Sequence, residues 1–232
     1  MRISLFAVLF VALAIGPSSA QDKERILPNC PMHIIIAMDF SASERAFIDE
    51  VQTVLLALTT RFELHPNSMR IGLVSFNRGA QMIQPLTGDT EELENTIEEL
   101  RIPVSVFATD IHAGIDMANE EFQKNSLESV KKFFILISDG DPHAHSRGFG
   151  FQQDLESIRS LKQGEIANHV DPVHVFSLYS GETIPFQDPW SEEVRLLSIK
   201  HMQNLASSQE DFYFFDEYPK LVNLLEQISS CL

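Results

Sequence analysis

The sequence is poor in cysteine, in glycine and in basic residues. It contains two Cys, ten Gly, and 17 Lys and Arg against 33 Asp and Glu among 232 residues. Two cysteines exclude a disulfide-dense mini-domain and a four-cysteine zinc site, so the fold must depend on a hydrophobic core. The formal net charge of -16 repels phosphate backbones and anionic lipids. The composition therefore argues against a nucleic-acid-binding protein.

The motifs of several enzyme classes are also missing. No glycine-rich phosphate loop follows the first apolar run, which argues against a Rossmann or P-loop protein. No Gly-x-Ser-x-Gly nucleophile elbow occurs, and a haloacid-dehalogenase phosphatase would need a second aspartate at the position of Ser41. A hydrolase that pairs Ser41 with one of the histidines would need a geometry that no motif indicates. The sequence favours a binding protein over an enzyme.

Long hydrophobic runs are missing beyond the first twenty residues. Residues 3–15 are almost all apolar, follow a basic residue, and lead into small residues that end at Ala20. This run is shorter than the roughly 20 residues that a membrane span needs, and the pattern is typical of a secretory signal peptide. We expect a secreted protein without a membrane span, in which residues 1–20 are the signal peptide, 21–29 a short lead-in, and 30–232 one domain.

Apolar runs of strand length alternate with helical periods along the rest of the chain. Strands are predicted at residues 34–38, 71–76, 133–137, 173–176 and 212–215. Helices are predicted over residues 47–62, 89–100, 111–122, 152–162, 191–205 and 221–228. Residues 80–86 follow the second strand after a gap short enough for a hairpin. The order predicts an α/β fold: a doubly wound, mostly parallel sheet with one antiparallel edge strand and helices on both faces.

Polar residues follow two of these strands and precede one helix. Asp39-Phe40-Ser41-Ala42-Ser43 follows the first strand, Thr109 lies before the helix at 111–122, and Asp139 follows the strand at 133–137. We expect these segments to meet at one edge, because ligands of doubly wound sheets bind beyond the carboxyl ends of the strands. A structural role for the first segment stays open, since a serine and a glutamate three residues apart, Ser41 and Glu44, have capping-box spacing.

Together the three segments resemble the metal-ion-dependent adhesion site of von Willebrand factor A-type domains, the family that includes the inserted domains of integrins. The family pattern is Asp-x-Ser-x-Ser after the first strand, a threonine before a later helix, and an aspartate after the fourth strand. The residues that match this pattern in order are Asp39, Ser41, Ser43, Thr109 and Asp139. The resemblance extends over roughly residues 30–231.

The resemblance implies a non-enzymatic protein that holds a divalent metal with carboxylate, hydroxyl and water oxygens. These hard ligands suit Mg²⁺ or Mn²⁺, and zinc is not expected because the pattern contains no His or Cys. An open position on the ion would then bind an Asp or Glu of an extracellular or cell-surface protein. Two alternatives stay open: a metal-assisted hydrolase that uses the same site, and a structural module without a metal-dependent partner.

Four residues beside the pattern could form a ligand-facing surface: Phe40, Asp141, His143 and His145. Phe40 stands where the family commonly has glycine, and its ring either packs beneath the loop or lies beside the metal. Packing is the stronger expectation, because single exposed phenylalanines are uncommon. His143 and His145 could bind zinc only together with further ligands, and none has a recognisable spacing.

The two cysteines are expected to form a disulfide. Cys30 precedes the first strand and therefore lies at the amino edge of the sheet. The terminal helix must run back antiparallel to the last strand, which returns Cys231 to the same edge. Unpaired cysteines are unusual in an oxidising compartment, so a secreted protein would join them.

The signal-peptide hypothesis predicts a processed amino terminus. Material collected outside the cell should begin at Gln21, because the small residues before it suit signal peptidase. Amino-terminal sequencing or intact mass measures this directly. Secreted material that still carries residues 1–20 would contradict the hypothesis.

Overall fold

The computed structural model describes residues 25–102, 108–141, 147–163, 172–181 and 189–231. Within these ranges, the side chains of residues 45–46, 147–150 and 189–191 are not described. The expected signal peptide and the pair His143 and His145 lie outside the described residues. None of the helices in the described ranges is both long enough and apolar enough to cross a bilayer.

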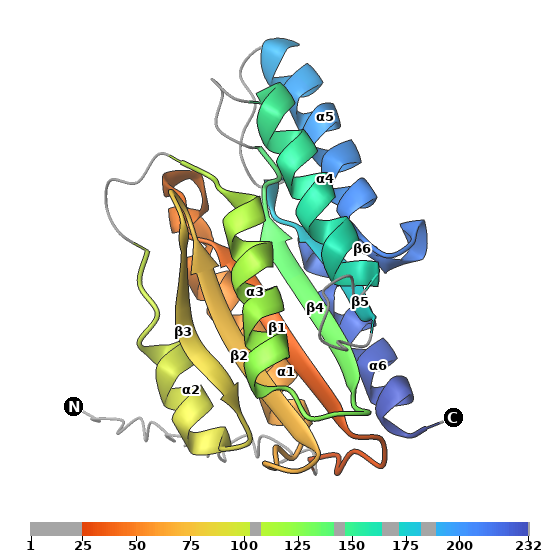
Figure 1. The fold of residues 1–232 in the computed structure, drawn as a ribbon. Helices are drawn as coiled ribbons and strands as arrows, with labels where there is room; N and C mark the ends of the chain where they lie inside the picture. Colours follow the sequence, from red (N-terminus) through yellow and green to blue (C-terminus); the bar gives the residue numbers. More distant parts are fainter. Residues whose placement is uncertain (1–24, 103–107, 142–146, 164–171, 182–188, 232) are drawn as a thin grey trace, which may run out of the picture.

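Six strands form one sheet in the order β3-β2-β1-β4-β5-β6 (Figure 1). β3 pairs antiparallel with β2, and the other neighbouring strands pair in parallel. This confirms the predicted fold class, including the antiparallel edge hairpin. The strands are β1 (Met32–Asp39), β2 (Met69–Phe76), β3 (Ala80–Thr87), β4 (Lys131–Ser138), β5 (Val173–Tyr179) and β6 (Phe212–Phe214).

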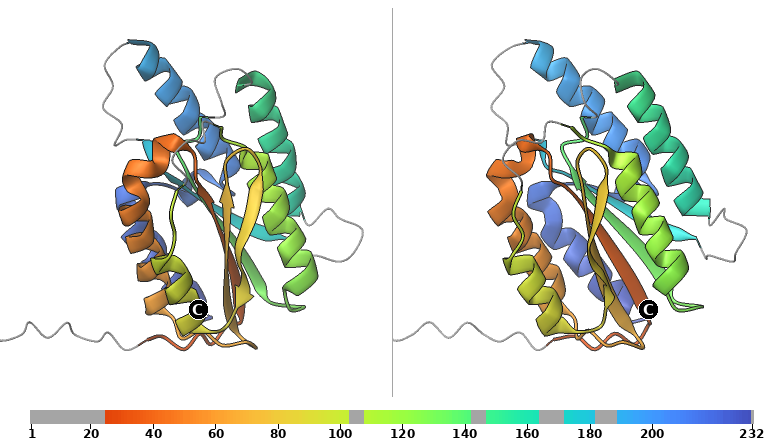
Figure 2. Two further views of the ribbon diagram at one scale, coloured as in Figure 1. Left: turned by 90° about the vertical axis from the view of Figure 1, so that its left-hand side faces the viewer. Right: turned by 60° about the vertical axis from the view of Figure 1, so that its left-hand side comes forward.

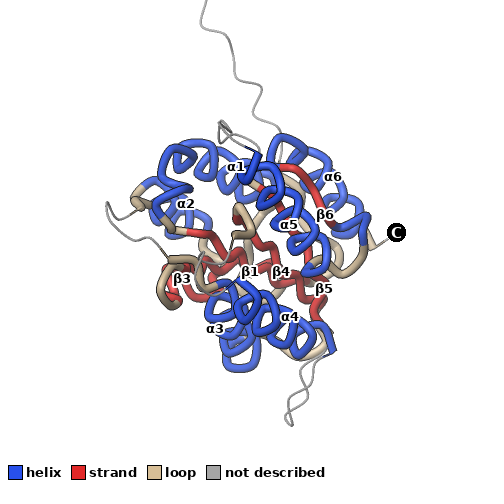
Figure 3. Tube along the Cα trace, turned by 90° about the horizontal axis from the view of Figure 1, so that it is seen from above, coloured by secondary structure: helices blue, strands red, loops and turns tan. Residues whose placement is uncertain are grey.

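Helices cover both faces of the sheet, as Figures 2 and 3 show from three further directions. One apolar core lies between the sheet and α1, α2 and α6, and a second lies between the sheet and α3, α4 and the end of α5. The helices are α1 (Ile48–Arg61), α2 (Thr90–Glu98), α3 (Ile111–Asn125), α4 (Arg147–Gln163), α5 (Pro189–Leu205) and α6 (Tyr218–Ser229). Short 3₁₀ turns stand before α1 (η1, Ala42–Phe47), before β6 (η3, Gln209–Asp211) and before α6 (η4, Phe215–Glu217).

The central strand β1 is buried along its whole length. Ile34 and Ile36 belong to the core beneath α1, whereas the alternate residues Ile35 and Ala37 belong to the core beneath α3. Side chains of a strand alternate between the faces of a sheet, so a strand between two helical layers must be apolar at consecutive positions. This explains the continuous apolar run from which the strand was predicted.

The strand order reverses beside β1, and this places two loops next to each other. The chain leaves β1 toward β2 on one side, and it later returns to the other side of β1 as β4. Met38 of β1 lies opposite Ile137 of β4 in the parallel register. The next residues along both strands therefore meet at the carboxyl edge of the sheet, where ligands of such folds bind.

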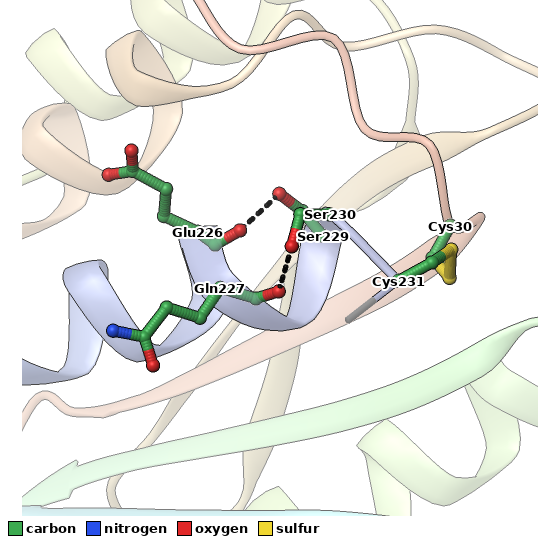
Figure 4. The surroundings of a disulfide bond; sticks show 6 residues. All are labelled: Cys30, Glu226, Gln227, Ser229, Ser230 and Cys231. Carbon is green, nitrogen blue, oxygen red and sulfur yellow. Dashed lines mark hydrogen bonds between the residues drawn. A yellow bond between two sulfur atoms is a disulfide. The ribbon is translucent and has the colours of Figure 1, made fainter.

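A disulfide joins the two ends of the domain at the opposite edge (Figure 4). Cys30 and Cys231 are bonded, with 5.5 Å between their Cα atoms and a sequence separation of 201. The backbone N–H groups of Asn29 and Cys30 both donate to the carbonyl oxygen of Ser229, at 2.9 and 3.1 Å. The structure thus contains the disulfide that the topology predicted.

A second set of contacts fixes the same region. Glu226 of α6 accepts two hydrogen bonds from Arg61 at the end of α1, the shorter at 2.6 Å. The lead-in segment joins the same helix end. The backbone N–H of Ile26 donates to the carbonyl oxygen of Arg61, and the carbonyl oxygen of Ile26 accepts the backbone N–H of Glu63. The chain before β1, the end of α1 and the terminal helix therefore form one connected unit.

Removing the disulfide should destabilise the protein without changing its fold. Closing a loop of this length stabilises a folded chain by about 5 kcal/mol in the chain-entropy model, and measured values are often smaller. We expect Cys30→Ser/Cys231→Ser to lower the free energy of unfolding in urea by several kcal/mol while the far-ultraviolet circular dichroism stays unchanged. An unchanged unfolding midpoint would show that the bridge adds nothing to stability.

Candidate metal site

Asp39 ends β1 and is held by hydrogen bonds on both carboxylate oxygens. Its Oδ1 accepts the backbone N–H of Ser41 at 2.8 Å, and its Oδ2 accepts the hydroxyl of Ser138 at 2.8 Å. Only 4% of the Asp39 surface is exposed. The carboxylate is therefore fixed in orientation at the carboxyl edge of the sheet.

The two serines of the Asp-x-Ser-x-Ser segment point to the same place. The Oγ atoms of Ser41 and Ser43 lie 2.9 Å apart, and the hydroxyl of Ser43 also hydrogen-bonds to the Asp139 carboxylate. Ser41 stands at the N-cap of the 3₁₀ turn η1, but its side chain makes no capping hydrogen bond there. The capping-box alternative is therefore wrong, and the hydroxyls face the carboxylates instead.

The loop after β4 brings the second aspartate to the site. Asp139 is 8% exposed, and its Oδ1 accepts the backbone N–H of Asp141 at 3.1 Å. Gly140 between them has φ +67°, and a Cβ atom there would lie 2.6 Å from Cγ of Met202. Glycine adopts this left-handed conformation without steric cost and leaves room for α5, so the turn needs glycine at this position.

Thr109 lies half-buried beside the amino end of α3. The neighbouring Asp110 caps this helix by accepting the backbone N–H of Ala113 at 3.2 Å. α3 ends shortly before β4 begins at the amino edge, so its first turn lies toward the carboxyl edge (Figure 1). Thr109 lies two residues before that turn. Among the contacts of the described residues, none joins Thr109 directly to Asp39 or Asp139.

Two of the expected ligand-facing residues can be placed. Phe40 is 5% exposed and belongs to the core beneath α1, which agrees with the stronger expectation that its ring packs beneath the loop. Its backbone N–H donates to the carbonyl of Phe76 at 2.7 Å, which continues the β1–β2 ladder and turns the ring inward. Asp141 is half-buried at the turn after Asp139.

A buried glutamate that the sequence analysis assigned only to a capping box also lies at this edge. Glu44 is 1% exposed, and its Oε1 accepts the hydroxyl of Ser180, the residue after β5, at 2.7 Å. Its Oε2 is buried and has no hydrogen-bond partner among the described residues. The only sequence signal for it was a charged residue directly after the Asp-x-Ser-x-Ser segment.

Burial and mutual repulsion make the carboxylates of this edge weak acids. Burial raises the pKa of Asp39 to about 7, and the negative charge of Asp139 adds to the rise. Burial also raises the pKa of Asp139, although hydrogen bonds from Asp141 and Ser43 oppose this. The pKa of Glu44 lies well above its usual value, first through burial and then through the charges of Asp139 and Asp39.

The donor set fits a hard divalent cation. Two buried carboxylates and two serine hydroxyls converge, and among the described side chains no lysine or arginine pairs with either aspartate. Within the described residues, no three His, Cys, Asp or Glu side chains lie close enough to hold one ion. A cation here would therefore be held by Asp39 and Asp139 together with hydroxyl and water oxygens, the mixture that Mg²⁺ prefers.

A comparison with protein families agrees with this arrangement. Residues 34–141, from β1 to the loop after Asp139, match the family model of the von Willebrand factor type A domain. Residues 34–141 of this chain are thus similar to a von Willebrand factor type A domain. The matched segment includes both aspartates and both serines described above.

Curated relatives match this chain over part of much longer proteins. Human matrilin-4 is 24% identical over 186 residues, which cover 69% of this chain and 30% of matrilin-4. Mouse integrin alpha-11 is 27% identical over 189 residues, which cover 80% of this chain and 14% of the integrin. This chain therefore spans less than a third of the length of either relative.

Solved structures show the same fold. Proximal thread matrix protein 1 from the mussel byssus superposes with a TM-score of 0.65 at 18% identity, over 86% of this chain and 46% of that chain. Another structure of that protein, with a TM-score of 0.62, is described as having a zinc-occupied metal-ion-dependent adhesion site. Zinc thus binds this type of site in at least one protein with this fold, although the expectation here was Mg²⁺ or Mn²⁺.

The raised pKa of Asp39 predicts how the metal-free protein responds to pH. The pKa of Asp39 in the folded protein is about 7, above its ordinary value of 3.8. Between these pH values the folded state keeps a proton on Asp39 that the unfolded state has released. This contribution to stability is complete below about pH 4 and is lost as the pH rises through 7. Asp39→Asn cannot ionise at this position. In chelator, the melting temperature of the variant minus that of wild type should therefore increase by several degrees from pH 5 to pH 8.

Thermal unfolding of both proteins at matched pH values measures this difference. Ionisable groups that both proteins share affect the two melting temperatures alike, so their contribution cancels. A melting-temperature difference that stays constant from pH 5 to pH 8 would show that Asp39 is not a weak acid in the folded protein.

Proposed function

We propose that this chain is a secreted von Willebrand factor A-type protein that binds an extracellular or cell-surface protein through a divalent metal. The proposal assigns residues 1–20 to the signal peptide and residues 30–232 to the binding domain. The metal-holding residues of the proposed site are Asp39, Ser41, Ser43, Thr109 and Asp139. The function is binding and not catalysis.

The observation that carries the proposal is the pair of buried aspartates at the carboxyl edge. Asp39 and Asp139 repel each other, and both are nearly inaccessible to water. Buried charges are normally paired with a charge of opposite sign or with a metal ion. A divalent cation between them would remove this repulsion, and the nearby serine hydroxyls would supply further oxygen ligands.

The cation would act as the acceptor for an acidic group of the partner. Mg²⁺ takes six oxygen ligands and usually keeps several waters, so a carboxylate from another protein can replace one of them. Ser138 and the Ser41 backbone hold Asp39 in place, and the tight turn at Gly140 holds Asp139. The residues of this chain thus orient the ion while leaving its outer side open.

The disulfide supports an extracellular location, because such bonds persist in oxidising compartments. The comparisons support a role in binding, since this chain is similar to part of an integrin chain and shares its fold with a matrix protein of the mussel byssus. No observation on this chain favours the hydrolase alternative.

Loss of one site aspartate should abolish metal binding without unfolding the protein. We expect Asp139→Ala to bind Mg²⁺ more than about 100-fold more weakly in calorimetric titration, because a buried anionic ligand is lost. The metal-free variant should be as stable as wild type or more stable, since the repulsion of Asp39 is gone. Thr109→Ala should weaken binding less, because water can replace a hydroxyl. Undiminished Mg²⁺ affinity in Asp139→Ala would refute the site.

The partner is tested by affinity capture from extracellular fluid. Immobilised wild type should retain proteins in Mg²⁺ and release them in chelator, whereas immobilised Asp139→Ala should not retain them. Parallel captures in Mn²⁺ and Zn²⁺ identify the metals that support binding. Retention that survives both the chelator and the substitution would show that binding does not use the metal.

A further inference from the structure

We propose that Glu44 is a third carboxylate of the metal site, which holds a metal-bound water through its free oxygen and so positions the ion without ligating it directly. This inference rests on the metal site proposed above and extends it to a residue outside the family pattern. Glu44 follows the Asp-x-Ser-x-Ser segment directly, in the 3₁₀ turn η1.

The side chain of Glu44 is buried where a glutamate would otherwise be costly. It is 1% exposed, and among the described side chains no lysine, arginine or histidine pairs with it. A buried carboxylate needs hydrogen bonds, a positive charge or a metal to offset the loss of water. A residue that served only to fill this space could be apolar at no such cost.

One half of the carboxylate is fixed by the protein, and the other half is free. Oε1 accepts the Ser180 hydroxyl at 2.7 Å, and Ser180 is held in turn by its backbone N–H, which donates to the carbonyl of Ser138 at 3.1 Å. Ser138 is the residue whose hydroxyl orients Asp39. Oε2 has no partner among the described residues, although it is buried.

The free oxygen belongs to the same electrostatic environment as the two aspartates. The backbone N–H of Asp139 hydrogen-bonds to the Glu44 carboxylate, so Glu44 lies beside the loop that carries the second aspartate. The three carboxylates do not converge closely enough to ligate one ion together. A water molecule bound to the cation would bridge this gap, because it donates a hydrogen bond to Oε2, and Mg²⁺ commonly keeps such waters.

The consequence is a site that carries one more negative charge than the family pattern supplies. Outer carboxylates that hold metal-bound groups typically change metal affinity by about 10- to 100-fold when they are removed. Glu44 should therefore tighten the binding of the cation. Because Ser180 follows β5, a bound cation should also fix the start of the loop after that strand.

The test is calorimetric titration of the full chain with Mg²⁺ alone and with Mn²⁺ alone. Glu44→Gln keeps the size of the side chain and its acceptor for Ser180, and it removes only the charge. We expect its affinity for both ions to fall by about 10- to 100-fold. Glu121→Gln is the matched control, because Glu121 is also a buried glutamate, but its two oxygens accept from Leu86 and Asn125. Its affinity should equal that of wild type.

Thermal unfolding separates a role at the metal from a merely structural one. In chelator, Glu44→Gln should melt no lower than wild type, because the variant keeps the size of the side chain and its acceptor for Ser180. Adding saturating Mg²⁺ should raise the melting temperature of Glu44→Gln by less than it raises the melting temperature of wild type. A structural residue would instead lower the melting temperature equally in both conditions, and that result would overturn the proposal.

The outcomes also distinguish this inference from the proposed function. If Glu44→Gln binds Mg²⁺ as tightly as wild type while Asp139→Ala does not bind, the metal site stands and the role of Glu44 is refuted. If wild type itself binds neither ion, both proposals fall. Should Glu44→Gln fail to fold, Ser180→Ala is the second variant. It removes the hydrogen bond that the Ser180 hydroxyl donates to Oε1 of Glu44, so it should weaken Mg²⁺ binding, and unchanged affinity there would overturn the proposal.

Discussion

The repulsion among buried carboxylates at the carboxyl edge of the sheet is the constraint around which this end of the molecule is organised. Asp39, Asp139 and Glu44 are each less than a tenth exposed, and the charges of the two aspartates raise the pKa of Glu44. Backbone N–H groups and serine hydroxyls stabilise these carboxylates only in part. The remaining negative charge is what a divalent cation would neutralise, so the electrostatic cost of the metal-free fold and the metal binding proposed for it have one origin.

The sheet makes this arrangement possible because it is rigid where the carboxylates leave it. β1 is buried between two apolar cores, and β4 lies beside it in register. Two aspartates at the ends of these strands are therefore placed by the backbone ladder and not by flexible side chains. The strand-end serines Ser138 and Ser180 then connect three neighbouring strands, since their hydrogen bonds reach from β4 and β5 to Asp39 and Glu44.

The opposite edge of the sheet carries the contacts that join the two ends of the domain. The Cys30–Cys231 bridge and the Arg61–Glu226 ion pair join the start of β1, the end of α1 and the end of α6. These contacts close the domain far from the carboxylates. The protein therefore separates the edge that is stabilised covalently from the edge where charge accumulates, and a substitution at one edge can be studied without disturbing the other.

Much of the fold could be predicted from the sequence, because its signals are local. Consecutive apolar residues predicted β1 as a strand buried on both faces, and a short gap predicted the hairpin of β2 and β3. The helical period over residues 89–100 predicted α2, and Asp89 caps this helix by accepting the backbone N–H of Glu92. The chain direction of α6 predicted the disulfide. The Asp-x-Ser-x-Ser segment and the later Asp139 could also be recognised, because a strand end fixes where its next residues lie.

Only the tertiary structure decided how the side chains at the carboxyl edge interact. Ser138 reaches Asp39 across 99 residues of sequence, and Ser180 reaches Glu44 across 136, so no local pattern could reveal either contact. The spacing of Ser41 and Glu44 indicated a capping box, yet the folded chain turns the serine toward Ser43 and the glutamate into the interior. Phe40 was likewise ambiguous until packing against the core beneath α1 placed it. The sequence by itself determined which residues reach this edge, because backbone periodicity is local, whereas burial and partners arise only when distant strands come together.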